Sequence, residues 1–333
     1  MRYLADRMLS LILTLFAMAV ITFFLARVVP ADPARLAAGI EARPEQIAAM
    51  RKELGLDRPL SEQFWTYMGG LARGDLGRSL RTRQPVIDDL RLYFPATLEL
   101  ALVTTVVIIL VSIPLGVVAA INAGGWIDYL IRFSVVTGMG VPAFALGLVL
   151  QLVFGRWLGW LPLDGRLDQF LAPPPQVTGM YTVDSLLAGD WTAFVSSVQH
   201  LILPVATLAL GRFAVACRFT RGSMLEVLTR DYIRVARGKG LTERVVMYRH
   251  ALRNALLPVT TVLGVQMGFL LGGTVLVETV FAWPGLGAYA VASAVSSDFY
   301  SAIGATLVIS AMFVVSNSTV DLLYRWIDPR IRL

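Results

Sequence analysis

The sequence predicts an all-α membrane protein that crosses the bilayer six times and carries a sizeable extracytoplasmic subdomain. Two observations support this fold class. Of the 333 residues, 56% are hydrophobic and only 16% are charged, and the mean hydropathy is +0.67, whereas a soluble domain has about a quarter charged residues. The chain also contains repeated apolar runs of about 20 residues, the length that a helix needs to span a membrane.

The net charge of +6 does not indicate a nucleic-acid-binding protein, because the excess basic residues lie in short segments beside the apolar runs. Such segments are typical of the cytoplasmic side of a membrane. Cys217 is the only cysteine, which excludes an intramolecular disulfide. The sequence has no GxxxxGK[ST] phosphate-binding loop and no HExxH motif. We therefore expect this chain to bind no ATP, cofactor or metal and to catalyse no reaction.

Residues 1–30 form the first predicted span, with an apolar run from about Leu9 to Val29. Arg2 and Arg7 precede the run, so we expect the N-terminus in the cytoplasm. No small-residue cleavage site interrupts it, which favours a retained span over a signal peptide. Residues 31–95 follow as the predicted extracytoplasmic subdomain, with ten basic and nine acidic residues. A polar segment this long crosses a membrane largely regardless of its charge.

Residues 96–333 form a predicted core of five further spans. We place these spans at about 97–121, 133–154, 201–219, 255–277 and 302–323. The Gly138–Pro142 stretch should interrupt the second of them, because proline removes a backbone hydrogen bond. Residues 156–199 are a second outer segment, rich in proline. The basic tail after Asp328 places the C-terminus in the cytoplasm, as six spans require.

Several polar or small residues lie within these spans. Arg212 is deep in its span, where a charge is a functional candidate by default; a pore-facing arginine and a snorkelling or packed arginine both remain open. Glycines at every fourth position share one helix face and allow close helix packing, within the subunit or at a subunit interface. The helix-packing and pore candidates are Gly264, Gln266, Gly268, Gly272, Glu278, Asn317 and Asp321.

The segment 222–254 is densely basic, with seven basic residues against three acidic ones. Its pattern predicts a first short helix that ends near Arg237, and a turn in which Gly238 and Gly240 flank Lys239. Glycine permits the left-handed conformation that such a reversal needs. Thr242 is positioned to cap a second helix. On charge alone, a solvated loop beside lipid headgroups would explain this segment equally well.

The order of residues in this segment resembles the cytoplasmic "EAA" signature of ABC importer permeases. Arg234 and Val235 replace the Glu and Ala of the general signature, and the gap from Gly240 to Pro258 is longer. Both features are similar to the peptide and nickel branch of that family, with its YIRxARxKGL and RHALRNALLP motifs. The stretches 54–60, 73–79 and 277–287 also resemble motifs of this branch, so the resemblance covers the whole chain.

The resemblance implies a type I importer permease, of the "B" kind, in a bacterial cytoplasmic (inner) membrane. It implies a second homologous permease subunit, two ATP-binding subunits that hold ATP and magnesium, and an extracytoplasmic solute-binding protein as partners. The implied contacts with the ATPase are Asp231, Tyr232, Arg234, Ala236, Arg237, Lys239, Gly240 and Leu241. Asp75, Trp283 and Pro284 are the implied contacts with the binding protein, although a packed cap with no binding role is the alternative.

The outer segment also bears on the substrate. Thr178–Met180 and Leu186–Trp191 resemble an insert of dipeptide-type members, which favours short peptides. The same architecture could instead import oligopeptides, glutathione or nickel. An ion-coupled secondary transporter is the rival from another class. Such proteins commonly show internal repeats and ionisable groups at the membrane midplane, whereas this sequence shows no repeat.

Overall fold

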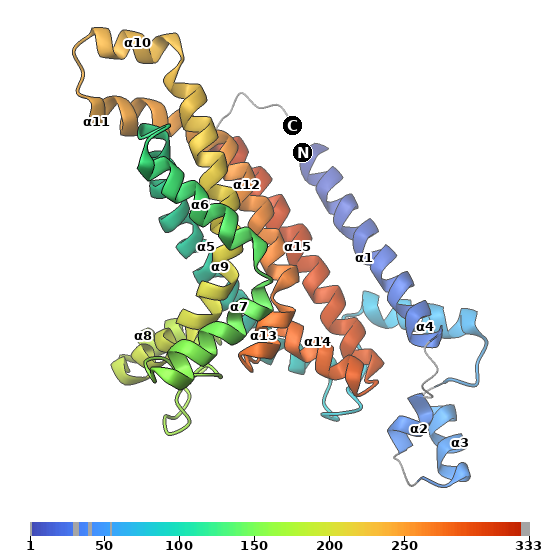
Figure 1. Cartoon of the computed structure of the whole chain (residues 1–333). Helices are drawn as coiled ribbons and strands as arrows, with labels where there is room; N and C mark the ends of the chain where they lie inside the picture. Colours follow the sequence, from blue (N-terminus) through green and yellow to red (C-terminus); the bar gives the residue numbers. More distant parts are fainter. Residues whose placement is uncertain (1, 29–32, 39–41, 54, 328–333) are drawn as a thin grey trace. The chain divides into compact units, whose positions relative to one another are not determined.

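The computed structural model describes residues 2–28, 33–38, 42–53 and 55–327, and this part of the chain is helical apart from loops and one isolated bridge between Arg78 and Pro85 (Figure 1). The end of the first predicted span and the basic tail lie outside these described residues. The helices are α1 Arg2–Val28, α2 Pro33–Ala38, α3 Pro44–Glu53, α4 Leu60–Ala72, α5 Val86–Ile121, α6 Trp126–Gly140, α7 Ala143–Leu150, η1 Gln151–Trp157, α8 Tyr181–Ala188, α9 Trp191–Leu228, α10 Asp231–Gly238, α11 Glu243–Val245, η2 Val246–Ala251, α12 Leu252–Gly273, α13 Val275–Val280, α14 Leu286–Val295 and α15 Phe299–Ile327. The all-α prediction is confirmed.

Within the described residues, four helical segments are long and apolar enough to cross a membrane: Val86–Ile121, Trp191–Leu228, Glu243–Gly272 and Phe299–Thr319. A bent pair, Trp126–Gly138 with Ala143–Trp157, becomes a fifth if it is counted as one span. The break lies at Val141 and Pro142, where the sequence predicts it. The apolar stretch Met8–Phe24 of α1 occupies the place of the first predicted span.

Two predicted helix boundaries differ from the structure. The span expected at 255–277 is not one helix, because α12 ends at Gly273 and α13 begins at Val275. The second short helix expected after Thr242 is also not separate: α11, η2 and α12 follow one another without a loop from Glu243 to Gly273. The basic residues there lie in the first turns of a long helix, which the charge pattern alone did not indicate.

The chain divides into two compact units, each of which is made of two separate stretches of the sequence. The first unit comprises Met1–Thr97 and Pro284–Met312, and the second comprises Leu98–Trp283 and Phe313–Leu333. In the first unit, Asp298 accepts hydrogen bonds from the hydroxyls of Ser79 at 2.5 Å and Ser301 at 2.8 Å. These bonds tie the loop before α5 to the start of α15.

The second unit is built around α9, which contacts α6, α7, α8 and α12. Asp190 caps this helix, since its carboxylate accepts a hydrogen bond from the Ala193 amide at 2.9 Å. On α5, a Cβ at Gly116 would lie 2.5 Å from the Cβ of Thr220. Glycine is therefore required for the close approach of α5 and α9.

Candidate functional site

The basic segment forms a helix and a glycine turn between α9 and α12. α10 runs from Asp231 to Gly238, and Lys239 is its C-cap residue. Gly240 then adopts φ +75°, the left-handed conformation that the sequence predicts at this turn. Thr242 stands at the predicted cap position with extended backbone, but its side chain makes no capping hydrogen bond. The turn therefore depends on the backbone freedom of Gly240 and not on a side-chain cap.

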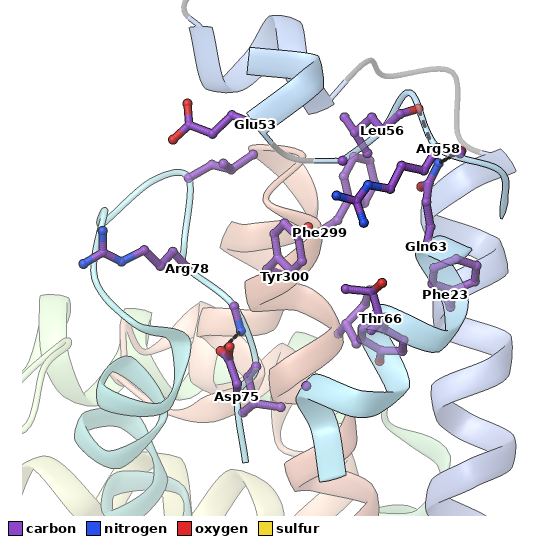
Figure 2. Close-up of a pocket in the computed structure, with 17 residues that line it drawn as sticks. Phe23, Glu53, Leu56, Arg58, Gln63, Thr66, Asp75, Arg78, Phe299 and Tyr300 are labelled. Carbon is purple, nitrogen blue, oxygen red and sulfur yellow. Dashed lines mark hydrogen bonds between the residues drawn. The ribbon is translucent and has the colours of Figure 1, made fainter. Parts of the chain in front are cut away.

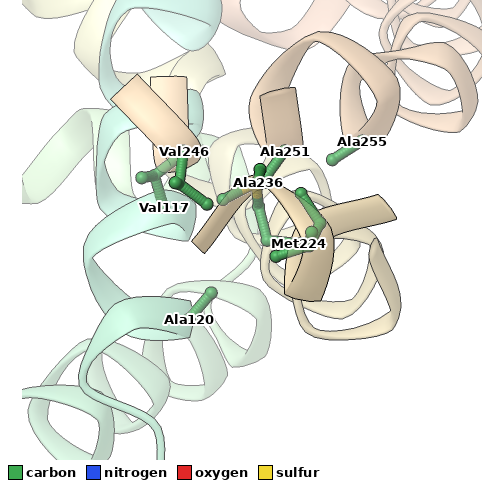
Figure 3. Packing of buried hydrophobic residues seen from close by; sticks show 8 residues of the cluster. Val117, Ala120, Met224, Ala236, Val246, Ala251 and Ala255 are labelled. Atoms are coloured by element: carbon green, nitrogen blue, oxygen red, sulfur yellow. The ribbon is translucent and has the colours of Figure 1, made fainter. Parts of the chain in front are cut away.

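α10 rests on the ends of three long helices through a buried cluster, here called the inner cluster (Figure 3). Its members come from five elements: Val117 and Ala120 of α5, Met224 of α9, Ile233 and Ala236 of α10, Val246 and Ala251 of η2, and Ala255 of α12. Ile233 and Met224 are fully buried. Ala236, one of the predicted ATPase contacts, is thus a packing residue in this chain.

The opposite face of α10 is exposed and combines cations with apolar side chains. Tyr232 and Val235 of α10 are 43% and 56% exposed, and Leu241, which follows the turn, is 40% exposed. Arg237 pairs with Glu243 at 2.7 Å, and Arg234 pairs with Asp231 at 3.4 Å. Exposed pairs of this kind contribute at most about 1 kcal/mol and break readily. The arginines can therefore exchange these partners for acidic groups on another protein.

An ion pair between the partly exposed Arg221 and a buried carboxylate holds α6 against α9 close to this segment. Arg221 donates two hydrogen bonds to Asp128, at 2.6 and 2.7 Å. The Asp128 carboxylate is fully buried and also accepts the Gly124 amide at 3.0 Å. No feature of the sequence indicates that Arg221 pairs with Asp128.

The pore candidates separate into distinct environments. Gly268 is buried, and a Cβ there would lie 2.9 Å from Oδ1 of Asn317 and 3.3 Å from the Phe313 ring. Gly264 is also buried, whereas Gly272 is exposed with open space beside it. The glycine face is therefore used within the chain at Gly268 and left uncovered at Gly272. Asp321 lies on α15, and its side chain is outside the part that the structure describes.

Glu278 and Gln266, the remaining polar candidates of this region, differ in exposure. Glu278 on α13 is fully buried and accepts a hydrogen bond from the Thr274 hydroxyl at 2.8 Å. This bond lies at the break between α12 and α13, so the carboxylate stabilises that break. Gln266 is half-buried on α12, where its Oε1 accepts from Nη1 of Arg212 at 3.2 Å.

The predicted binding-protein contacts also differ in exposure. Trp283 is 1% exposed, with the Arg166 guanidinium 5.4 Å from its ring centre. Its indole therefore has no surface to offer a partner in this conformation. Pro284 and Asp75 are exposed. Asp75 lies in a tight turn, where its carboxylate accepts the Gly77 amide at 2.9 Å.

Asp75 also lines a cavity of about 500 Å³ in the first unit (Figure 2). Side chains of both charges surround it, Arg58 and Arg78 against Glu53 and Asp75. Gln63 and Tyr67 also line this cavity, but Oε1 of Gln63 and the Tyr67 hydroxyl are themselves buried. The charged side chains are therefore the groups through which the cavity can bind a polar partner.

One buried network was not predicted. Glu99 accepts a hydrogen bond from Arg166 at 2.5 Å, and also accepts the amide and hydroxyl of Thr182 at 2.8 and 2.6 Å. Arg166 stacks over the Tyr181 ring at 3.9 Å. The pair joins α5 to the outer segment and α8. The position of Glu99 near the outer end of an apolar run was a signal for it, whereas Arg166 lies in a loop without any pattern.

The carboxylate of Asp184 organises the neighbouring loop. Burial raises the pKa of this carboxyl, but hydrogen bonds from Thr178, Gly179 and Val177 outweigh burial and bring its pKa below the ordinary value. A depressed folded-state pKa stabilises the fold above the unfolded pKa, and the stabilisation is lost as the pH falls through the folded pKa. The hydrogen bonds to the Asp184 carboxylate therefore stabilise the loop fully at neutral pH.

Comparison with known proteins places almost the whole chain in one family. Residues 112–333 match the family described as binding-protein-dependent transport system inner membrane component. Residues 1–101 match the N-terminal family of the same membrane components. Together the two matches cover all of the chain except residues 102–111.

Three relatives match this chain over nearly its full length. The probable D,D-dipeptide transport system permease protein DdpB of Escherichia coli K12 is 47% identical, over 98% of this chain and 96% of the relative. The dipeptide transport system permease protein DppB of Alkalihalophilus pseudofirmus is 42% identical, over 99% of each chain. The glutathione transport system permease protein GsiC of Escherichia coli K12 is 41% identical, over 100% of this chain and 99% of the relative.

Proposed function

Because this chain belongs to the inner-membrane components of binding-protein-dependent transport systems, we propose that it is the "B"-type permease subunit of an ATP-driven importer of short peptides, chiefly dipeptides. The observation that carries this proposal is the full-length identity to relatives named for dipeptide transport, at 47% and 42%. The relative named for glutathione is 41% identical, so a glutathione importer is the second candidate.

The uncovered face of α10 supports an ATPase subunit as the partner on the cytoplasmic side. Its exposed arginines fit acidic side chains, and the apolar Tyr232, Val235 and Leu241 fit a hydrophobic groove. Tyr232 is held in place, since its hydroxyl accepts a hydrogen bond from Asn254 at 3.0 Å. In this proposal two ATPase subunits bind ATP and magnesium, and a second permease completes the pathway.

The exposed Asp75 and the cavity beside it support contact with an extracytoplasmic binding protein. A lysine or arginine of that protein could pair with the exposed Asp75. Pro284 is a further contact in this proposal. Trp283 is assigned a packing role instead, because its side chain is buried.

Loss of this permease is expected to abolish uptake of a radiolabelled dipeptide into intact cells, and the restored gene is expected to recover it. The measurement is initial uptake of dipeptide, tripeptide, glutathione and Ni²⁺ in parallel, with an unrelated amino acid as the control. If dipeptide uptake persisted and glutathione uptake were lost, the second candidate would replace the first. If uptake of all four substrates persisted without the permease, the proposal would be contradicted.

The proposed topology predicts which exposed positions face the outside of the cell. In a Cys217→Ser background, Gln176→Cys and Ser296→Cys are expected to react with an impermeant maleimide in intact cells. Thr229→Cys, at the end of α9, is expected to react only after permeabilisation. All three positions are exposed, so reactivity reports sidedness and not burial. Labelling of Thr229→Cys in intact cells would overturn the topology.

A further inference from the structure

One side of α12 is left uncovered by this chain and carries no charge of its own. Its exposed positions recur every three or four residues, the spacing of one helix face. They are Pro258, Thr261, Val265, Phe269 and Gly272, here called the open face. The opposite side packs inside the chain through Ala255, Val259, Leu263 and Leu270.

Arg212 of α9 places its guanidinium at the edge of the open face. Its Nη1 donates to Oε1 of Gln266 at 3.2 Å, and its Nη2 donates to the carbonyl oxygen of Phe269 at 3.4 Å. Both acceptors are neutral and both hydrogen bonds are long. Among the described residues Arg212 forms no ion pair, whereas Arg166 and Arg221 each have a buried carboxylate. A guanidinium has five N–H donors, so most of its donors remain available.

This position is not suited to lipid. Arg212 lies within the spanning segment Trp191–Leu228, and a charge in such a segment faces the protein interior or a water-filled path. A snorkelling arginine would extend along its own helix toward the headgroups. The contacts with Gln266 and Phe269 direct this guanidinium across to α12 instead. An anionic partner that passes along the open face fits these contacts best.

Resting on the proposed import of peptides, we propose that Arg212 receives the substrate's carboxylate during translocation and determines selectivity for peptides with a free C-terminal carboxyl group. A guanidinium binds a carboxylate through two parallel hydrogen bonds. The long bonds to Gln266 and Phe269 are weak enough to be exchanged for these. The remaining apolar wall adds no second charge to retain the anion, and a translocation site must release its cargo.

The test compares two labelled probes, alanyl-alanine and alanyl-alanine amide, in proteoliposomes that contain the complete importer and its binding protein. Each rate is divided by the wild-type rate for the same probe, so the binding protein's own preference cancels. Arg212→Gln is expected to lower uptake of the free acid about tenfold, equivalent to about 1.4 kcal/mol. Uptake of the amide should change by less than about twofold. Arg212→Lys keeps the charge and is expected to retain most free-acid uptake.

Arg156→Gln is the matched control, because it removes one positive charge from an exposed site outside the fourth span. It is expected to leave both rates unchanged. Equal losses for both probes in Arg212→Gln would overturn the inference and leave the peptide function standing. If the wild-type importer took up neither probe, both the inference and the proposed peptide function would be overturned. If Arg212→Gln does not assemble, the test uses Gln266→Leu instead. This variant keeps the arginine but removes the Gln266 side chain that accepts its hydrogen bond. An equal effect on the uptake of both probes in Gln266→Leu would likewise contradict the inference.

Discussion

Gly240→Val is expected to separate ATP hydrolysis from transport without preventing membrane insertion. Gly240 has φ +75°, and a Cβ there would meet nothing within 4 Å. The penalty therefore comes from the backbone alone, about 1–3 kcal/mol for a side chain held in a sparsely populated conformation. If the turn rearranges to relieve that strain, α10 changes its orientation and loses its fit to the ATPase. A loss of 1.4 kcal/mol in docking corresponds to about tenfold weaker association.

The measurement is assembly, ATP hydrolysis and dipeptide uptake in one reconstituted preparation. Gly238→Val is the matched control, since Gly238 also has open space around it but has no positive φ. The control is expected to resemble wild type, and Gly240→Ala should fall between the two. Wild-type values of all three quantities in Gly240→Val would show that the turn has no coupling role.

Breaking the buried Glu99–Arg166 pair is expected to lower the free energy of unfolding more than breaking an exposed ion pair does. The two side chains are 2% and 6% exposed. Removal of one partner from a buried pair leaves an uncompensated charge and costs about 3–5 kcal/mol. Arg166→Met should therefore lower the free energy of unfolding of the purified subunit strongly. Glu99→Gln should act in the same direction, because Arg166 then lacks its carboxylate.

The measurement is the denaturation midpoint of the detergent-solubilised protein. The double variant Glu99→Gln with Arg166→Met should recover part of the loss, because neither charge is then left alone. The exposed pair Arg91–Asp88, with side chains 75% and 53% exposed, provides the control. Arg91→Met should cost at most about 1 kcal/mol. Equal effects of Arg91→Met and Arg166→Met would contradict the assigned role of burial.

Local chemistry explains what the sequence predicted well. Apolar run lengths located the helical segments that are long enough to cross a membrane, because the bilayer fixes the length of a spanning helix. The glycines around Lys239 predicted a left-handed residue, which the structure assigns to Gly240. Pro142 predicted the break between α6 and α7, because proline cannot donate the hydrogen bond that would continue a helix. The family resemblance, read from the basic segment, is confirmed by the family match.

The features that sequence reasoning missed depend on the membrane boundary or on distant partners. α5 begins at Val86, before the apolar run. Its first turn is held by Asp89, which is buried and accepts hydrogen bonds from the hydroxyls of Thr82 and Tyr289. The contacts between Asp128 and Arg221, and between Glu99 and Arg166, join residues far apart in the chain. A single sequence contains no information about such pairs. The roles assigned to the coupling and pore residues remain predictions.

The inner cluster has a consequence for how force passes through the molecule. Because α10 shares its buried side chains with α5, α9, η2 and α12, this packing links the position of α10 to the ends of those helices. Close-packed interiors are stiff and transmit strain. A displacement applied to α10 is therefore expected to reach the ends of α5, α9 and α12 through these shared contacts.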